Sequence, residues 1–360
     1  MHRLEKLRKL MRSENIDGML ITSSSNLRYM TNFTGTAGLA IVSDNHAVFI
    51  TDFRYTEQAK KQAIQYEVIE YQGNIIDEIA KQVERLKIER LGFEQEHVTF
   101  YTYELYKNKL SCELVPTSNV IEKLRLIKDE SEVELIKKAA DIADQAFDHI
   151  LSYIKPGVRE REIANELEFY MRKLGATSSS FDIIVASGIR SALPHGVASD
   201  KKIEHGEMVT LDFGAYYEGY CSDLTRTVAV GDPGDKLKEI YSIVLEAQTL
   251  GVEKIKPGMS GKEADAITRD YISKHGYGQY FGHSTGHGIG LDIHEGPTLS
   301  LRSTQLLEKG MVVTVEPGIY IAGVGGVRIE DDILLTEDGN ERLTHSRKDL
   351  IILSMLRRIY

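Results

Sequence analysis

The chain has 360 residues, of which 42% are hydrophobic and 27% charged, and its formal net charge is −10. These values are typical of a globular protein with about two domains and argue against a long disordered chain. The negative charge disfavours general nucleic-acid binding, which needs a basic surface for phosphates. No apolar run approaches the roughly 18 residues of a membrane span, so we expect a soluble protein with neither nucleic-acid nor membrane partners.

The N-terminal segment and the cysteines predict a cytoplasmic location. Residues 1–8 alternate charges with leucines and lack the apolar core of a signal peptide, which predicts an amphipathic helix. Cys112 and Cys221 lie far apart in the sequence and cannot form a disulfide framework. This cysteine usage favours a reducing compartment.

Residues 1–122 are predicted to form an α/β domain of modest size. Runs of β-branched and aliphatic residues predict strands, and stretches with helical periodicity lie between them. The predicted strands are 18–22, 39–42, 47–51 and 90–94, and the predicted helices are 55–63, 75–86 and 101–110. The polar residues of this domain form no pattern of metal-ligand types, so we assign it no chemistry.

A boundary near residues 120–128 opens a second domain, predicted to span 123–360. A long helix follows the boundary, because apolar residues at steps of three and four form one stripe along it. Ser131 and Glu134 have the spacing of a capping box at its start. The Lys-Pro-Gly sequence at 155–157 is expected to end the helix.

The second domain contains a weak internal repeat. An Ile-Lys-Pro-Gly sequence occurs twice, and each copy is followed by a helical stretch that ends in glycine. A longer aligned segment of twelve residues has five identical positions. The aligned segments are 154–157 with 255–258, 203–214 with 307–318, and 220–223 with 327–330. The repeat predicts two similar halves related by an approximate two-fold axis.

The repeat arranges four acidic residues in pairs. Each half can form a β-hairpin, which would put Asp212 across from Asp223 and, in the other half, Glu316 across from Glu330. Carboxylates opposed at short range repel strongly unless cations lie between them. A lone acid in a strand is usually a solvated residue or a cap. Four acids in two similar apolar frames favour a metal site instead.

Histidines beside glycines gather in the same half of the chain. The segment 282–297 contains His283, His287 and His294, and His195 stands in a separate turn. A single histidine beside glycine is usually a structural hydrogen-bonding residue, but four of them near the paired acids predict a functional site. The many glycines argue against a helical metal pair at His283 and His287. The zinc-protease helix motif, the phosphate-binding loop and the serine-hydrolase elbow are absent from the sequence.

The order of these residues closely resembles that of the pita-bread metallopeptidases, and within them the Xaa-Pro branch of aminopeptidase P and prolidase. The resemblance covers the whole chain and implies an α/β (α+β) protein. Its first domain is similar to the creatinase-type N-terminal domain, and its second is similar to the pseudo-two-fold pita-bread catalytic domain. The residues that carry the resemblance are Asp212, Asp223, His287, Glu316 and Glu330, with His195, His283 and His294 around them.

The resemblance implies a site for two divalent metal ions. Asp212 would bind one ion, and Asp223 and Glu330 would bridge both. His287 and Glu316 would complete the ligand shell of the other ion, and Glu316 would also act as the general base. Four carboxylates with one imidazole suit Mn²⁺ best, with Co²⁺ or Zn²⁺ as alternatives. The ions would activate a water and polarise the scissile carbonyl.

The resemblance also implies residues that contact the substrate. His195 and His294 would hydrogen-bond the scissile carbonyl or the developing oxyanion. His283 would line the pocket for the proline ring, with Tyr320 nearby. Arg328 resembles a residue that supports a metal ligand or binds a substrate carboxylate.

The implied reaction is hydrolysis of the Xaa-Pro bond at the N-terminus of dipeptides or short peptides, by a homodimer. The motifs leave open whether the enzyme is a dipeptidase or an aminopeptidase P, although the compact length favours a dipeptidase. Methionine aminopeptidase-like activity is the nearest alternative, but the first domain and the His195 turn fit the Xaa-Pro branch better. Creatinase works without metals and lacks the full ligand set. A non-catalytic peptide-binding pseudoenzyme of the same fold is the remaining alternative, although such proteins usually lose ligands.

Overall fold

The computed structural model describes residues 3–353, which divide after Arg125 into two compact units. The predicted N-terminal helix is present as α1 (Arg3–Ser13), while Met1 and His2 lie outside the described residues. Among residues 3–353, no helix combines the length and the apolar character that a membrane span requires.

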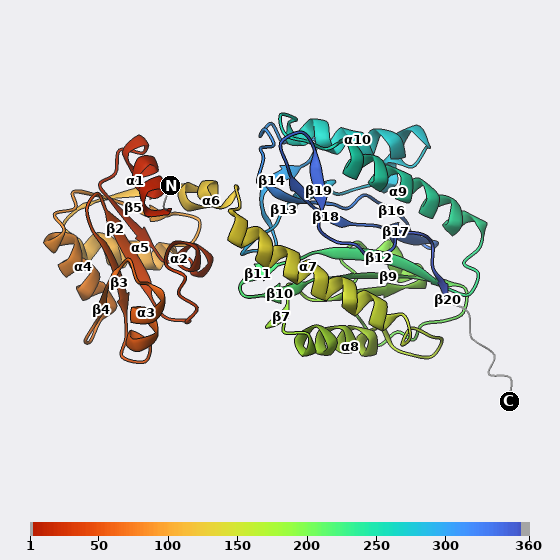
Figure 1. Ribbon diagram of the computed structural model, residues 1–360, viewed down its shortest axis with the longest axis horizontal. Helices are drawn as coiled ribbons and strands as arrows, with labels where there is room; N and C mark the ends of the chain where they lie inside the picture. The colour runs from red at the N-terminus through yellow and green to blue at the C-terminus, as the bar shows by residue number, and fades with distance from the viewer. Residues whose placement is uncertain (1–2, 354–360) are drawn as a thin grey trace. The chain divides into compact units, whose positions relative to one another are not determined.

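The first unit is built around a six-stranded mixed sheet (Figure 1). Its strands are β1 (Gly18–Ile21), β2 (Leu39–Ser43), β3 (Ala47–Thr51), β4 (Glu67–Glu70), β5 (Arg90–Glu94) and β6 (Glu113–Thr117). They lie in the order β4-β3-β2-β1-β5-β6, with antiparallel pairs on both sides of β2 and parallel pairs elsewhere. The other helices of this unit are α2 (Ser24–Thr31), α3 (Thr56–Gln62), α4 (Ile75–Arg85), α5 (Phe100–Lys109) and α6 (Val120–Arg125).

The strands and helices predicted for this unit are confirmed, with ends that differ by one residue at most. Strands β4 and β6 were not predicted. They form the two edges of the sheet, and their residues are mostly exposed or half-buried. Edge strands carry polar residues, so their apolar signal is weak. Helix α2 was not predicted either, and its buried face includes the polar residues Asn26 and Thr31.

The second unit holds its sheets between two pairs of helices, as Figure 1 shows. The helices are α7 (Glu130–Ile150), α8 (Glu160–Lys173), α9 (Asp235–Lys254) and α10 (Gly261–Lys274). The strands of the first half are β7 (Ser178–Ser179), β8 (Ile184–Ser187), β9 (Glu207–Phe213), β10 (Ala215–Tyr217), β11 (Tyr220–Cys221) and β12 (Leu224–Val230). Those of the second half are β13 (Gly286–Gly288), β14 (Glu295–Leu299), β15 (Val312–Val315), β16 (Gly318–Ile321), β17 (Gly325–Arg328), β18 (Asp331–Leu335), β19 (Asn340–Arg342) and β20 (Ile352–Leu353).

The helix pairs of the second unit pack against its strands. The sheet orders are β20-β12-β9-β8, β14-β13-β15-β18-β19, β11-β10-β7 and β16-β17. Phe147 of α7 and Leu167 of α8 share a buried cluster with Leu211 of β9. Ile240 of α9 shares another with Val327 of β17. Burial of these apolar faces holds the strand ends that carry the acidic residues.

Matching contacts in the two halves agree with the predicted repeat. The Gly157 N–H donates to Ile203 O at 2.8 Å, and the Gly258 N–H donates to Leu307 O at the same distance. The two glycines have φ angles of 90° and 89°, a region that favours glycine. Helices α8 and α10 follow them at equivalent positions.

The start of α7 differs from the prediction. Asp129, not Ser131, is the N-cap: its carboxylate accepts from the Glu132 N–H at 3.0 Å, and Glu132 accepts from the Asp129 N–H at 2.9 Å. The capping box predicted at Ser131 and Glu134 is therefore wrong. Aspartate is as good an N-cap as serine, so the spacing by itself does not distinguish the two starts. The helix also ends at Ile150, before the predicted stop.

Candidate metal centre

In the first half of the repeat, the two acidic residues do not face each other. Strands β9 and β12 pair with Asp212 opposite Thr225, and Asp223 lies in the short gap between β11 and β12. The predicted pairing of Asp212 with Asp223 is therefore wrong by two residues. The register is set by a two-residue turn, Glu218 and Gly219, in which both residues have a positive φ.

In the second half, the predicted pairing agrees with the strand register. The β15–β18 and β16–β17 ladders share one register, which puts Glu316 opposite Glu330 in the gap between them. Thr225, not Asp223, then occupies the position that corresponds to Glu330. The sequence alignment of 220–223 with 327–330 is two residues out, because these two four-residue segments share no identical residue that could fix it.

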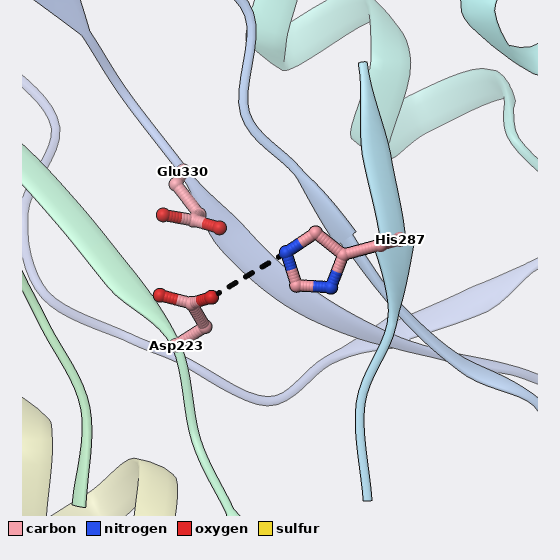
Figure 2. A group of neighbouring side chains, drawn as sticks. All are labelled: Asp223, His287 and Glu330. Carbon is pink, nitrogen blue, oxygen red and sulfur yellow. Dashed lines mark ion pairs between the residues drawn. The ribbon is translucent and has the colours of Figure 1, made fainter. Parts of the chain in front are cut away.

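Side chains from both halves meet at one point, as Figure 2 shows. Asp223, His287 and Glu330 each offer a ligand atom within 4.8 Å of the other two. His287, on β13, has its Nε2 atom 3.7 Å from Asp223 Oδ2 and 3.3 Å from Glu316 Oε1. The absence of a helix around His287 was correctly predicted, and the strand directs its ring at the acids.

A cleft of about 800 Å³ opens onto this cluster. Nine of the ten predicted site residues line it: Asp212, Asp223, His287, Glu316, Glu330, His195, His283, His294 and Arg328. Tyr320 lies behind this wall, where its hydroxyl is 2.8 Å from both Arg328 Nη1 and His283 Nε2. His195 and His294 are exposed in the cleft, so they are accessible to a bound substrate.

Arg328 is buried among the acidic residues and is 3% exposed. Its Nη2 atom lies 2.5 Å from Asp212 Oδ2, and its Nε atom donates to Thr225 Oγ1 at 3.2 Å. Thr225 in turn donates to Glu330 Oε2 at 2.6 Å. Arg328 thus orients Asp212 directly and Glu330 through a hydroxyl. This geometry favours support of the ligands over binding of a substrate carboxylate.

Three residues that hold the acids and His287 were not predicted from the sequence. Besides Thr225, these are Thr314 and Asp332. Thr314 Oγ1 accepts from the His287 N–H and donates to Glu316 Oε1, both at 3.1 Å. Asp332 accepts from the Asp223 N–H at 2.9 Å. The Thr-x-Glu spacing at Thr314 was the available signal, since residues two apart on a strand share a face.

The acidic side chains have strongly perturbed pKa values. Burial, with added repulsion from Asp212, raises the pKa of Glu316 to about 8, although Arg328 acts in the opposite direction. Burial and repulsion from neighbouring carboxylates raise the pKa values of Asp223 and Glu330 well above the ordinary range. Carboxylates so close together are costly to ionise without a cation.

The donor set fits divalent cations. Asp212 Oδ1, Asp223 Oδ1 and Glu330 Oε1 are buried and have no hydrogen-bond partner among residues 3–353. Burial lowers the pKa of His287 to about 4, so its ring is neutral near pH 7. His287 Nδ1 is 3.0 Å from Gly288 O, an arrangement that leaves the Nε2 lone pair for a metal.

Without metal, the protein is expected to lose stability as the pH rises. The pKa of Glu316 is raised from 4.5 to about 8 in the folded state. A carboxyl with a raised pKa binds its proton more tightly when folded, so its contribution is complete below the unfolded pKa and is lost as the pH rises through the folded pKa. Added Mn²⁺ should therefore raise the melting temperature more at about pH 8 than at about pH 6. Equal shifts at both pH values in a thermal melt would contradict this coupling.

Comparisons with known proteins cover both units. The profile of the creatinase/prolidase N-terminal domain matches residues 3–127, and that of metallopeptidase family M24 matches residues 134–337. The chain is similar to an Xaa-Pro dipeptidase from Pyrococcus furiosus, with 45% identity over 97% of this chain and 99% of the relative.

Solved structures agree with these matches. The structure of an Xaa-Pro dipeptidase from Bacillus anthracis is 64% identical, with a TM-score of 0.97 over 97% of this chain and 99% of that one. The structure of an X-Pro aminopeptidase from Thermotoga maritima is 43% identical, with a TM-score of 0.90 over 96% and 99% of the two chains. The chain therefore belongs to metallopeptidase family M24 and carries the creatinase/prolidase N-terminal domain.

Proposed function

We propose that this metallopeptidase hydrolyses the peptide bond between an N-terminal residue and proline, in dipeptides or short peptides, with two divalent metal ions. One observation carries the proposal: both halves of the repeat direct carboxylates and one neutral imidazole to one point of a cleft, where buried carboxylate oxygens have no hydrogen-bond partner among the described residues. Relatives described as Xaa-Pro dipeptidases and as an X-Pro aminopeptidase support the substrate class.

The five ligands divide between the two ions. Asp212 would hold one ion, Asp223 and Glu330 would bridge both, and His287 and Glu316 would complete the ligands of the other ion. This oxygen-rich set favours Mn²⁺ over metals that prefer thiolates. When bound, the ions would polarise the scissile carbonyl and lower the pKa of a water.

The chain's own residues would handle the proton and the developing charge. Glu316, held by Thr314, would accept a proton from the attacking water and pass it to the proline nitrogen as the bond breaks. That nitrogen needs a proton because it would otherwise leave as an amide anion, which is a poor leaving group; with the proton it leaves as the amine of proline. His195 and His294 would donate hydrogen bonds to the carbonyl oxygen as its negative charge grows.

The cleft also has surfaces that suit a proline ring. Phe181, Ile184, Val197 and Ile293 give its wall an apolar part. His283 lies beside it, and burial together with the nearby Arg328 lowers its pKa to about 4. A neutral ring and apolar side chains can pack on a pyrrolidine without an unpaired charge.

Hydrolysis assays with metal-stripped protein, with and without Mn²⁺, test this proposal. Mn²⁺-dependent cleavage of an Xaa-Pro dipeptide alone would indicate a dipeptidase, and cleavage of an Xaa-Pro-Yaa tripeptide as well would indicate an aminopeptidase P. Cleavage only of peptides that begin with methionine and lack proline would favour the methionine aminopeptidase alternative. Metal binding without any cleavage would favour a peptide-binding pseudoenzyme. The homodimer and the cytoplasmic location stay predictions.

A further inference from the structure

A buried ion pair lies at the edge of the cleft and has no part in the mechanism above. Lys128 Nζ is 3.2 Å from Glu295 Oε2, and the two side chains are 1% and 8% exposed. Lys128 is the third residue of the second unit, and its N–H donates to Gly310 O at 2.9 Å. Charges so deeply buried persist only when they are paired, so the position of Lys128 fixes the position of Glu295.

Glu295 closes the loop 289–294, which joins β13 to β14 and carries His294. The second carboxylate oxygen of Glu295 accepts from the Asp292 N–H at 3.0 Å. Within the loop, the Gly290 N–H donates to Asp292 O at 3.2 Å, and Gly290 O accepts from the Cys221 N–H at 2.8 Å. The loop is thus held at one end by Glu295 and at Gly290 by the backbone of Cys221, two residues before Asp223.

The carboxylate of Glu295 packs tightly on this loop. A Cβ atom added at Gly290 would lie 2.7 Å and 2.8 Å from its two oxygens. Only glycine at position 290 therefore lets the carboxylate lie this close to the loop backbone. The ring of His294 lies 4.4 Å from the ring of His287, and both His294 and Glu295 line the cleft.

We propose that Lys128 is a positioning residue: its ion pair with Glu295 fixes the loop 289–294 and so sets the place of His294 beside the metal ligands. Lys128 acts through Glu295 and touches neither substrate nor metal. It also neutralises a carboxylate on the wall of a cleft that is lined by five other acids. The kinetic part of the test rests on the proposed Xaa-Pro activity, and a spectroscopic part does not.

The kinetic test replaces the pair by neutral residues, K128M/E295Q, which avoids an unpaired buried charge and keeps an acceptor for the Asp292 N–H. Because misplacement of a group near the reacting atoms costs about 10–100-fold, kcat should fall at least tenfold, with KM and metal content little changed. The same change in an H294A background should cause no further loss. K128R should keep most of the activity. Activity of K128M/E295Q within about twofold of the wild type, or an equal loss in the H294A background, would overturn the proposal.

A matched control is K137M on α7. Lys137 pairs with Glu341 at 2.6 Å in the same unit, but the side chains are 43% and 48% exposed. Exposed pairs contribute little, so K137M should have wild-type kcat. A loss like that of K128M/E295Q would show that any lysine pair has this effect, which also overturns the proposal.

Histidine NMR of the metal-free protein tests the positioning role of Lys128 even if no Xaa-Pro peptide is cleaved. The His294 ring signal is assigned with H294A, and His149, which stacks on Tyr170 at 3.8 Å, serves as the reference. We expect K128M/E295Q to shift the His294 signal and leave that of His149 unchanged. An unchanged His294 signal would overturn the positioning role. Absence of wild-type cleavage with a shifted signal would overturn only the proposed function.

Discussion

Glu316→Gln is expected to lower kcat by about 10²–10⁴-fold while the protein keeps most of its metal. Glutamine has nearly the same shape and retains one oxygen for a ligand, but it cannot accept a proton. The side chain is 16% exposed and receives a hydrogen bond from Thr314, so the substituted group should stay in place. Steady-state kinetics on an Xaa-Pro peptide, with metal content measured on the same sample, give both quantities.

The matched control for this change is Glu337→Gln, because that side chain is 74% exposed and lies in the same unit. It should have wild-type kcat. Near-normal turnover of the Glu316 variant would remove Glu316 as the base. Loss of turnover in proportion to lost metal would show that Glu316 acts only as a metal ligand and not as the base.

Asp223→Asn is expected to weaken both metal ions together, by more than about 100-fold in affinity, since even outer-shell changes cost about 10–100-fold. The same variant should be more stable than the wild type when both are metal-free near pH 8. The reason is that burial, Glu330 and Asp212 all raise the pKa of Asp223, so its ionised form destabilises the folded state without a cation. Metal titration and thermal melting of the stripped proteins measure the two effects.

Asp200→Asn is the control for the second prediction, because the Asp200 side chain is 69% exposed and pairs with the exposed Arg161. Neither metal affinity nor metal-free stability should change. Loss of a single ion in Asp223→Asn would contradict a bridging role. A metal-free variant that is no more stable than the wild type would contradict the electrostatic argument.

The proposed ligand residues could be selected from the sequence because metal chemistry restricts residue types. Acids in two similar apolar frames and histidines beside glycines already indicated a cation site, and the structure brings Asp223, His287 and Glu330 within ligand distance of one another. The central strands of the first domain could be predicted equally well, since a continuously buried strand appears as an apolar run in the sequence. Edge strands such as β4 and β6 are less buried and leave a weaker signal.

The residues that support the proposed ligands could not be predicted from the sequence in this way. Thr225 is an ordinary β-branched residue in a buried strand, and nothing in its sequence context shows that its hydroxyl bonds to Glu330. For Thr314 the one signal was its position two residues before Glu316. Their contacts depend on strand register, and a two-residue turn at Glu218 and Gly219 sets that register in the first half. The predicted pairing of Asp212 with Asp223 was wrong for this reason.

The sequence by itself therefore determined the family resemblance, the α/β fold class and the set of acids and histidines, because these follow from residue type, order and periodicity. The tertiary structure decided which groups touch. Lys128 and Glu295 are separated by 167 positions in the chain, and Arg328 meets Asp212 only where β9 and β17 come together. Contacts of this kind arise from packing between distant segments, which leaves no local pattern in the sequence.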